Sequence, residues 1–491
     1  MFNKPNVLIL MTDQHRFDMM TCAGNTAVPT PNIDRIAKRG VRFENAYCPY
    51  PVCVASRSSM LTGLYAHSTG AITNQDRLDW RYKTMAHHFS ENGYLTALIG
   101  KMHFNDVHNH GFDYKMSIND WLMYLGPKVQ MYANEIASHP LSEHFTQTVN
   151  DDGAGFPDVA LWDDVGPWAG HVTRSDFKSM ASEMNNEEHM DAFLIRETIK
   201  FLENHKSHPF FLITSLMKPH TPLFAPKEYA DSYPIEKETL PEIGDYSNYP
   251  LFIQERIKNM KDTPEHLKKA HRAGYKANLK CVDDCIGILY DYLENSGLID
   301  NTIVVYTSDH GEMDGDHGLF QKFCLFDPAV KVPFIVSYPG HLQENVVSDA
   351  LVELIGLYPT LARLAGTSPI TSTTIHPIEN APDSLDAVSF ANVVYNPKSQ
   401  GLEYAFSEYN LRADGANYML RDRQYKYILN ENDIDELYDL INDPGEFNNL
   451  INNAEYNDVA QRMKNCLISK HDPDKNPYKG KSENFNPAVV I

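Results

Sequence analysis

The segment PVCVASRSSMLTG, residues 51–63, places a thiol and a guanidinium one helical turn apart, in Cys53 and Arg57. The pattern predicts that a helix begins close to Cys53. The positive end of a helix dipole stabilises a bound anion or an ionised nucleophile. Cys53 therefore has three interpretations: a cysteine nucleophile, a cysteine converted after translation into another group, or a buried free thiol, which is the commonest environment of an unpaired cysteine.

Two pairs of metal-type side chains each come directly after a predicted strand: Asp13 and Gln14 after residues 6–11, and Asp309 and His310 after residues 303–307. In a parallel α/β sheet, ligands bind outside the carboxyl ends of the strands, so both pairs are expected to face one crevice. Two carboxylates, an amide oxygen and an imidazole make a suitable ligand set for one divalent cation. Either aspartate alone would as readily cap a turn, and the repetition at two strand ends favours the metal site.

Basic side chains repeat this arrangement: Lys101 and His103 follow a strand at 95–99, His220 follows a strand at 210–214, and Lys322 lies in the loop beyond His310. The chain has 43 Lys and Arg against 65 Asp and Glu, a net charge of -22. An anionic substrate therefore needs a local positive pocket, which these groups supply together with Arg57. A tetrahedral oxyanion ester suits such a pocket, because the charge of its transition state spreads over several oxygens.

The elements that must position these residues alternate between strands and helices. Short apolar runs predict strands at 6–11, 95–99, 210–214, 303–307 and 334–337, and helices are predicted at 31–40, 189–204, 267–296 and 349–364. Such alternation predicts an α/β fold with a large, mostly parallel mixed sheet that is flanked by helices.

A stretch rich in Pro, Ser and Thr at 367–382 predicts a junction between a catalytic domain, 1–370, and a smaller C-terminal α+β domain, 371–491. In the second domain we expect a short antiparallel sheet and a helix, with strands at 404–408, 418–421 and 425–429 and the helix at 453–467. Residues 105–185 predict a loop-rich insertion over the site. Its aromatic residues would either frame a sugar or pack the core of the insertion itself: Trp121, Tyr124, Trp162 and Trp168.

The composition, with 42% apolar residues and a mean hydropathy of -0.42, is typical of a soluble enzyme. No apolar run approaches the ~20 residues of a membrane helix, and the net charge disfavours binding to nucleic acid or an anionic membrane. The N-terminus MFNKPNVLILM predicts a buried strand rather than a secretory signal. We therefore expect a cytoplasmic protein, or a periplasmic or secreted one if a signal segment was removed.

With these residues in place, the chain resembles the type I sulfatases of the alkaline phosphatase-like superfamily. The resemblance is carried by motifs in family order along the whole chain: Met11-Thr12-Asp13-Gln14, Cys53-Val54-Ala55-Ser56-Arg57 with Leu61-Thr62-Gly63, Gly100-Lys101-Met102-His103, Lys218-Pro219-His220, Ser308-Asp309-His310-Gly311, Lys322, and Glu436-Leu437-Tyr438-Asp439-Leu440 with Asp443-Pro444.

In that family a dedicated maturation enzyme oxidises the signature cysteine to Cα-formylglycine, so the resemblance implies this partner and this conversion at Cys53. One hydroxyl of the hydrated aldehyde would attack sulfur, and the other would drive the elimination of sulfate. The implied ligands of one divalent cation, Ca²⁺ by the family pattern, are Asp13, Gln14, Asp309, His310 and the modified Cys53. Arg57 would hold the diol and His103 would orient or deprotonate it. The implied sulfate-binding residues are Lys101, His220 and Lys322, with His220 as the first choice of acid for the leaving group.

Three positions depart from the pattern common in sulfatases. Gln14 stands where many have a second aspartate, and His310 stands where many have an asparagine. This pairing is similar to choline-sulfatase-like enzymes and to phosphonate monoester hydrolases, which use the same formylglycine on phosphodiesters. An imidazole ligand suits Mn²⁺ or another transition metal better than Ca²⁺, and Mg²⁺ also stays open. Ala55 replaces the usual proline, a variant associated with the oxygen-independent maturation route.

Three functions follow from this reading. The leading one is a sulfuric ester hydrolase acting on a sulfated carbohydrate or another small alkyl or aryl sulfate. The second is a phosphonate monoester or phosphodiester hydrolase on the same scaffold. The third is a non-catalytic binding protein that keeps the pocket without the modification, and the retention of the nucleophile, metal and cation positions argues against it.

Overall fold

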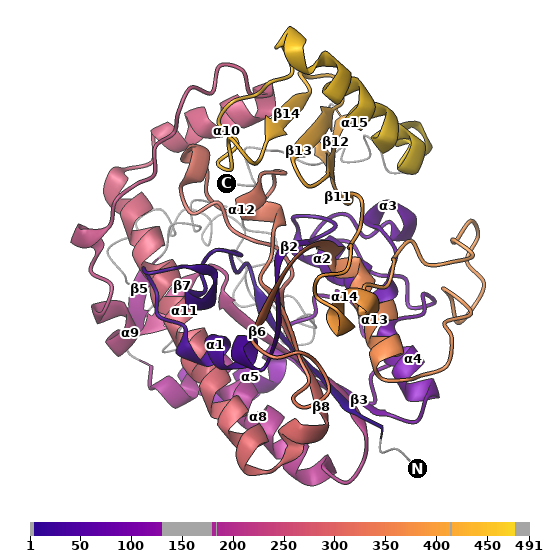
Figure 1. The fold of residues 1–491 in the computed structure, drawn as a ribbon. Helices are drawn as coiled ribbons and strands as arrows, with labels where there is room; N and C mark the ends of the chain where they lie inside the picture. Colours follow the sequence, from indigo (N-terminus) through magenta and orange to yellow (C-terminus); the bar gives the residue numbers. More distant parts are fainter. Residues whose placement is uncertain (1–3, 130–178, 183, 413–414, 477–491) are drawn as a thin grey trace.

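The computed structural model describes residues 4–129, 179–182, 184–412 and 415–476. Its main element is an eight-stranded sheet in the order β10-β2-β9-β8-β1-β6-β3-β4 (Figure 1). The strands are β1 (Asn6–Asp13), β2 (Gly40–Tyr47), β3 (Leu95–Gly100), β4 (Tyr114–Met116), β6 (Phe210–Pro219), β8 (Thr302–Ser308), β9 (Phe334–Ser337) and β10 (Val346–Glu353). Neighbouring strands are parallel, except that β9 is antiparallel to β2 and β8. The predicted mixed, mostly parallel sheet is confirmed.

Both faces of the main sheet are buried because its central strands are apolar on both sides. In β1, Val7, Ile9 and Met11 belong to one core cluster, whereas Leu8 and Leu10 belong to another. Helices cover the first face with α2 (Cys53–Thr62), α4 (Met85–Glu91) and α13 (Leu357–Leu364), and the second with α1 (Pro31–Lys38), α5 (Ile118–Leu125), α8 (Met190–His205) and α11 (Glu265–Asn295) (Figure 1). Continuous apolar runs are what a sheet covered on both faces requires.

A second sheet lies near the C-terminus, and it is four-stranded and antiparallel. It consists of β11 (Ala405–Arg412), β12 (Gly415–Arg421), β13 (Tyr425–Asn430) and β14 (Glu436–Asp439). Helix α15 (Asn457–Lys470) packs on it through the buried Met463 and Leu467 (Figure 1). The three strands and the helix predicted in this region are confirmed, and β14 adds a fourth strand.

Several smaller helices and strands lie outside these two sheets and their covering helices. They are α3 (Ala66–Thr69), α9 (Lys227–Asp231), α10 (Leu251–Lys261), α12 (Asp327–Val330), α14 (Ala391–Tyr395) and the paired strands β5 (Ser179–Ser182) and β7 (Leu223–Pro226). Among all these described helices, none combines the length and the apolar character needed to cross a bilayer.

The predicted helix at 349–364 is wrong over its first part. Residues up to Glu353 belong to β10, which pairs in parallel with β2, and α13 begins only at Leu357. Leu351 and Val352 are buried in this pairing, so tertiary packing overrides the local pattern. Strand β2 was not predicted either, because polar residues interrupt its sequence GVRFENAY.

A buried ion cluster joins the C-terminal sheet to α12. The side chain of Lys426, in β13, is fully buried, and its Nζ lies 2.6 Å from Asp327 Oδ1 and 2.5 Å from Glu446 Oε1. The backbone N–H of Asp327 donates to Glu446 Oε2 at 2.6 Å. Helix α12 also accepts backbone hydrogen bonds from Gly311 and Glu312. The cluster therefore connects the C-terminal sheet to the loop that follows β8.

Lys426→Met is expected to lower the free energy of unfolding by about 3–5 kcal/mol, because removing one partner of a buried ion cluster leaves uncompensated charge. Urea denaturation followed by circular dichroism measures this change. Lys258→Met, at an exposed position of α10, is the control and should change the free energy by less than about 0.5 kcal/mol. Equal effects of the two substitutions would show that the cluster does not stabilise this junction.

Candidate active site

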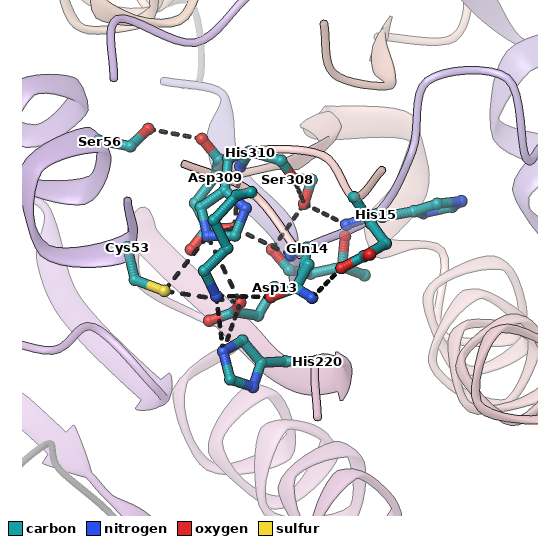
Figure 2. Close-up of polar contacts among 12 residues, drawn as sticks. Asp13, Gln14, His15, Cys53, Ser56, His220, Ser308, Asp309 and His310 are labelled. Carbon is teal, nitrogen blue, oxygen red and sulfur yellow. Dashed lines mark hydrogen bonds and ion pairs between the residues drawn. The ribbon is translucent and has the colours of Figure 1, made fainter. Parts of the chain in front are cut away.

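Four side chains with metal-ligand chemistry meet at the carboxyl edge of the main sheet. Asp13 ends β1, Asp309 and His310 follow β8, and Cys53 begins α2. One ligand atom of each lies within 4.8 Å of those of the other three, and all four residues are buried (Figure 2). Cys53 Sγ lies 3.2 Å from His310 Nε2 and 3.8 Å from Asp13 Oδ1. The structure thus brings together residues that are far apart in the sequence.

Arg57 links the two carboxylates from the second turn of α2. Its Nε donates to Asp309 Oδ2 at 2.7 Å, and its Nη2 donates to Asp13 Oδ2 at 3.0 Å. Its Nη1 donates to Ser215 Oγ at 2.9 Å and to the Lys101 carbonyl oxygen. Burial alone would lower the pKa of Arg57, but the two carboxylates raise it above its ordinary value. The guanidinium is therefore a fixed positive charge behind the two carboxylates.

Lys101 supplies a second cation beside the same carboxylate. Its Nζ lies 2.7 Å from Asp13 Oδ2 and 3.9 Å from Cys53 Sγ. Burial and the sulfur of Cys53 would raise the pKa of Asp13, but Lys101, His220 and Arg57 outweigh both and hold it well below its usual value. Asp13 is therefore a carboxylate throughout the physiological pH range.

The surroundings of Cys53 select an anion at the position of its sulfur. Burial by itself would raise the pKa of the thiol, but Lys101, Lys322 and His310 bring it well below the ordinary value of 9.0. Cys53 is also the first residue of α2, so the helix dipole acts in the same direction. Any group built at this position is held in a field that stabilises negative charge.

Lys322 connects Gln14 to His220. Its Nζ donates to Gln14 Oε1 at 2.6 Å and lies 2.9 Å from His220 Nε2. His220 Nδ1 bonds the carbonyl oxygen of Thr221, so Nδ1 carries the proton and Nε2 accepts from the ammonium. Burial, and then Lys322, lower the pKa of His220. Its side chain keeps 19% of its surface exposed, which places it on the open side of the site.

His103 follows β3 in a left-handed backbone conformation, with φ of 68°, and Gln14 follows β1 with φ of 70°. Left-handed backbone is uncommon for residues other than glycine and is concentrated at functional sites. Burial lowers the pKa of His103 to about 4, although its interaction with Cys53 opposes this shift. His103 is therefore a neutral imidazole beside Cys53.

Two polar residues close in sequence to predicted site residues do not face the site. Lys218 lies with its Nζ 3.7 Å from Asp191 Oδ2 of α8, and is nearly buried. His15 Nδ1 lies 2.7 Å from the hydroxyl of Tyr306, and Figure 2 shows its ring pointing away from Cys53. A polar neighbour in the sequence therefore need not share the site.

Several supporting residues were missed by sequence reasoning. Ser56 Oγ donates to the Asp309 carbonyl oxygen at 2.6 Å, and the hydroxyl of Tyr275 donates to the Gln14 carbonyl oxygen at 2.7 Å. Glu312 accepts a hydrogen bond from Gln14 Nε2. The position of Glu312 two residues after His310 was a signal that could have been used, whereas Tyr275 lies inside the long helix α11 and offered none.

The insertion predicted at 105–185 lies mostly outside the described residues, and so do Trp162 and Trp168. Trp121 is only 6% exposed, belongs to the core cluster that contains α8, and donates from Nε1 to the Glu188 carbonyl oxygen at 2.7 Å. It packs the fold and does not frame a ligand. Tyr124 is 50% exposed, with its ring 5.1 Å from that of Phe193.

Carboxylates, an amide and an imidazole at the ends of parallel strands, faced by cations and a helix N-terminus, are the features of an alkaline phosphatase-like hydrolase of oxyanion esters. Comparison with known proteins narrows this class. The Sulfatase family profile matches residues 5–367, and the profile for the N-sulphoglucosamine sulphohydrolase C-terminal region matches residues 315–472. The chain belongs to the sulfatase family, and it is a sulfuric ester hydrolase.

Individual relatives agree with this assignment. The chain is 31% identical to an arylsulfatase of Clostridium perfringens, over 95% of this chain and 94% of that protein. It is 26% identical to an N-acetylglucosamine-6-O-sulfatase of Bacteroides thetaiotaomicron, over 96% and 88% of the two chains. Among solved structures, the phosphonate monoester hydrolase of Agrobacterium radiobacter superposes with a TM-score of 0.75 over 95% of each chain, at 22% identity. That last likeness concerns the fold.

In metal-free protein made without a maturation enzyme, the Cys53 thiol is expected to titrate below 9.0, as a thiolate stabilised by Lys101. The ultraviolet absorbance of the thiolate, measured against pH and referred to Cys53→Ala, isolates this group. Cys22 will not interfere, since burial raises its pKa to about 12.

Lys101→Met should move the Cys53 titration upward by about 1–3 pH units, because an opposite charge at this range shifts a pKa by that amount. Lys258→Met, far along the exposed surface of α10, should leave it unchanged. A Cys53 titration at or above 9.0 in the unsubstituted protein would contradict the described field.

Proposed function

We propose that this chain hydrolyses sulfate esters of carbohydrates or other small organic alcohols, using one divalent cation and a formylglycine made from Cys53. The observation that carries the proposal is the gathering of cations around Asp13 and Cys53. Lys101 lies 2.7 Å from Asp13 and 3.9 Å from Cys53. In a chain of net charge -22, such a concentration of positive charge is suited to an anionic ester.

The donor set fits a divalent cation. Asp13 and Asp309 offer anionic oxygens, Gln14 offers an amide oxygen, and His310 offers an imidazole nitrogen. His310 Nδ1 bonds the carbonyl oxygen of Gly311 at 2.9 Å, which directs Nε2 toward the other ligands, as in many protein metal sites. We propose Mn²⁺ or another transition metal ahead of Ca²⁺ and Mg²⁺, because of this imidazole. When bound, the cation would polarise the ester and stabilise its developing charge.

The same surroundings fit a formylglycine at position 53, whose hydrated form supplies the nucleophile in this family. The neutral imidazole of His103 beside Cys53 is placed to accept a proton from that nucleophile. Arg57 orients the carboxylates of Asp13 and Asp309 through its two ion pairs. A maturation enzyme that modifies Cys53 is part of this proposal.

Lys101 and Lys322 are proposed to bind the oxygens of the sulfate group. The proton for the leaving alcohol would come from Lys322 together with His220, and not from His220 alone. Their nitrogens lie 2.9 Å apart, and the lowered pKa of His220 leaves its imidazole neutral at physiological pH. A proton passed from the ammonium to Nε2, which lies 3.9 Å from Asp13 Oδ1, would be available inside the site for the leaving alcohol.

A sulfated sugar is the substrate class we propose. The support comes from the relative named N-acetylglucosamine-6-O-sulfatase, which is similar over 96% of this chain. The buried Trp121 gives no support to an aromatic surface on which a sugar could stack.

We also propose that the chain divides into two domains near residue 370, with residues 1–370 as the catalytic domain and 371–491 as a smaller domain.

Protein co-produced with a maturation enzyme should release inorganic sulfate from a sulfated monosaccharide and from an aryl sulfate. Tryptic mass spectrometry should show that the peptide containing Cys53 has lost the mass expected for formylglycine. Cys53→Ala should abolish turnover, by more than about 10³-fold as for loss of a nucleophile, and keep the far-ultraviolet circular dichroism. Fully active protein with an unmodified Cys53 would contradict the proposal.

An aryl phosphonate monoester, assayed in parallel, distinguishes the alternative function. The pairing of Gln14 with His310 is the feature that keeps this alternative in view. We expect the sulfate ester to be turned over with the higher kcat/KM. A phosphonate preference of several orders of magnitude would mean that the sulfate ester is the secondary substrate of this scaffold.

A further inference from the structure

The side-chain amide of Gln14 is fully buried between a group that only donates hydrogen bonds and a group that accepts them. On one side, Lys322 Nζ lies 2.6 Å from Gln14 Oε1. On the other side, Gln14 Nε2 bonds Glu312 Oε2 and, at 3.2 Å, Gln321 Oε1. An ammonium group cannot accept a hydrogen bond. Both neighbours therefore require the same orientation of the Gln14 amide, with its oxygen toward Lys322 and its nitrogen toward Glu312.

Glu312 is itself fixed as an acceptor by the backbone. Its Oε1 accepts the N–H of Asp314 at 2.9 Å and the N–H of Gln321. Its carboxyl group is fully buried and lies 3.6 Å from His271 Nε2 of α11. Because Oε1 is taken by backbone donors, Oε2 is the oxygen presented to Gln14. The carboxyl group thus has one orientation, in which Oε2 accepts the hydrogen bond from Gln14 Nε2.

The side of Gln14 that carries the oxygen is the side of the proposed metal site. Lys322, which binds Gln14 Oε1, also lies 2.9 Å from His220 Nε2, and that nitrogen lies 3.9 Å from Asp13 Oδ1. The backbone N–H of Gln14 donates to Asp309 Oδ1 at 3.1 Å. An inverted amide would present hydrogens toward the cation and lose a ligand.

We propose that Glu312 is a positioning residue, which holds Gln14 as a neutral ligand with its oxygen directed at the cation. The inference rests on the proposed function, because it assumes that a divalent cation binds here. It also gives a physical reason for an amide at position 14. A carboxylate there would lie within hydrogen-bond distance of the Glu312 carboxylate, and two buried like charges so close together repel each other.

A reciprocal exchange of the two side chains tests this assignment through metal affinity and without substrate. Isothermal titration calorimetry of EDTA-stripped full-length protein with Mn²⁺ gives the dissociation constant. Glu312→Gln is expected to weaken binding by about 10–100-fold, the usual cost of losing a residue that orients a metal ligand. The new amide would present a donor to Gln14 Nε2 and force the Gln14 amide to invert. Gln14→Glu is expected to weaken binding to a similar extent through repulsion.

Combining Gln14→Glu with Glu312→Gln should restore the affinity for Mn²⁺ to within about tenfold of that of the unsubstituted protein. A loss of about tenfold is the smallest that we expect for either single variant. The amide at 312 can then donate to the carboxylate at 14 while its oxygen still accepts the backbone N–H groups. A role of Glu312 in folding alone would give no such rescue.

Asp316→Asn is the matched control, since Asp316 lies in the same loop and pairs with Arg16 at 2.8 Å. It should change the dissociation constant less than twofold, well below the loss expected at Glu312.

Two results would overturn the assignment. One is Glu312→Gln binding Mn²⁺ as tightly as the unsubstituted protein. The other is a double variant as weak as the product of the single effects. If the unsubstituted protein binds no Mn²⁺, the proposed metal site itself fails, and this inference fails with it. If the unsubstituted protein binds Mn²⁺ but either of the two results above is found, only the role of Glu312 fails. The thermal midpoint of each variant confirms that the chain is folded before it is titrated.

Discussion

The site depends on one buried guanidinium that holds the ends of two central strands together. Arg57 reaches Asp13 at the end of β1 and Asp309 after β8 with bonds of 3.0 and 2.7 Å, in full burial. Charges buried in this way are stable only when each is paired and hydrogen-bonded. Helix α2 must therefore begin at the carboxyl edge of the sheet, and this places Cys53, one turn before Arg57, beside the same carboxylates. The position of Cys53 therefore follows from the ion pairs that Arg57 makes with the two carboxylates.

The field around Cys53 follows from the same geometry. The chain carries a net charge of -22, yet Lys101, Lys322 and His310 together hold the pKa of this thiol well below its ordinary value. Cations come from the ends of strands and from the loop beyond β8, while the helix dipole adds to them. The net negative charge of the chain and the cationic site are therefore separate properties of the molecule, and the second decides which chemical group can be bound. An ester that gains negative charge in its transition state is the reactant that such a site stabilises.

Much of this arrangement could be predicted from sequence because the informative residues stand at the ends of strongly apolar runs. Residues 6–11 and 303–307 are buried on both faces, and their ends mark the edge where Asp13 and Asp309 meet. The pattern predicts a helix over the end of β10, residues 349–353, because the pairing of this strand with β2 is a tertiary contact that no local pattern reports. The contact between Gln14 and Glu312 joins residues 298 positions apart, and motif position alone does not reveal which of them orients the other. Lys218 shows that membership of a recognised motif does not by itself place a side chain in the site, since this residue turns to α8 and pairs with Asp191.

The most direct test of the account is a crystal structure of the protein loaded with Mn²⁺, with the metal located by its anomalous scattering. The account predicts one strong peak at the carboxyl edge of the main sheet, within about 2.6 Å of oxygens from Asp13, Gln14 and Asp309 and of His310 Nε2. It also predicts that Arg57 keeps its bonds to both carboxylates. A peak elsewhere, or Lys101 still placed against Asp13 with no metal between the ligands, would contradict the central claim that these residues form a metal and oxyanion site.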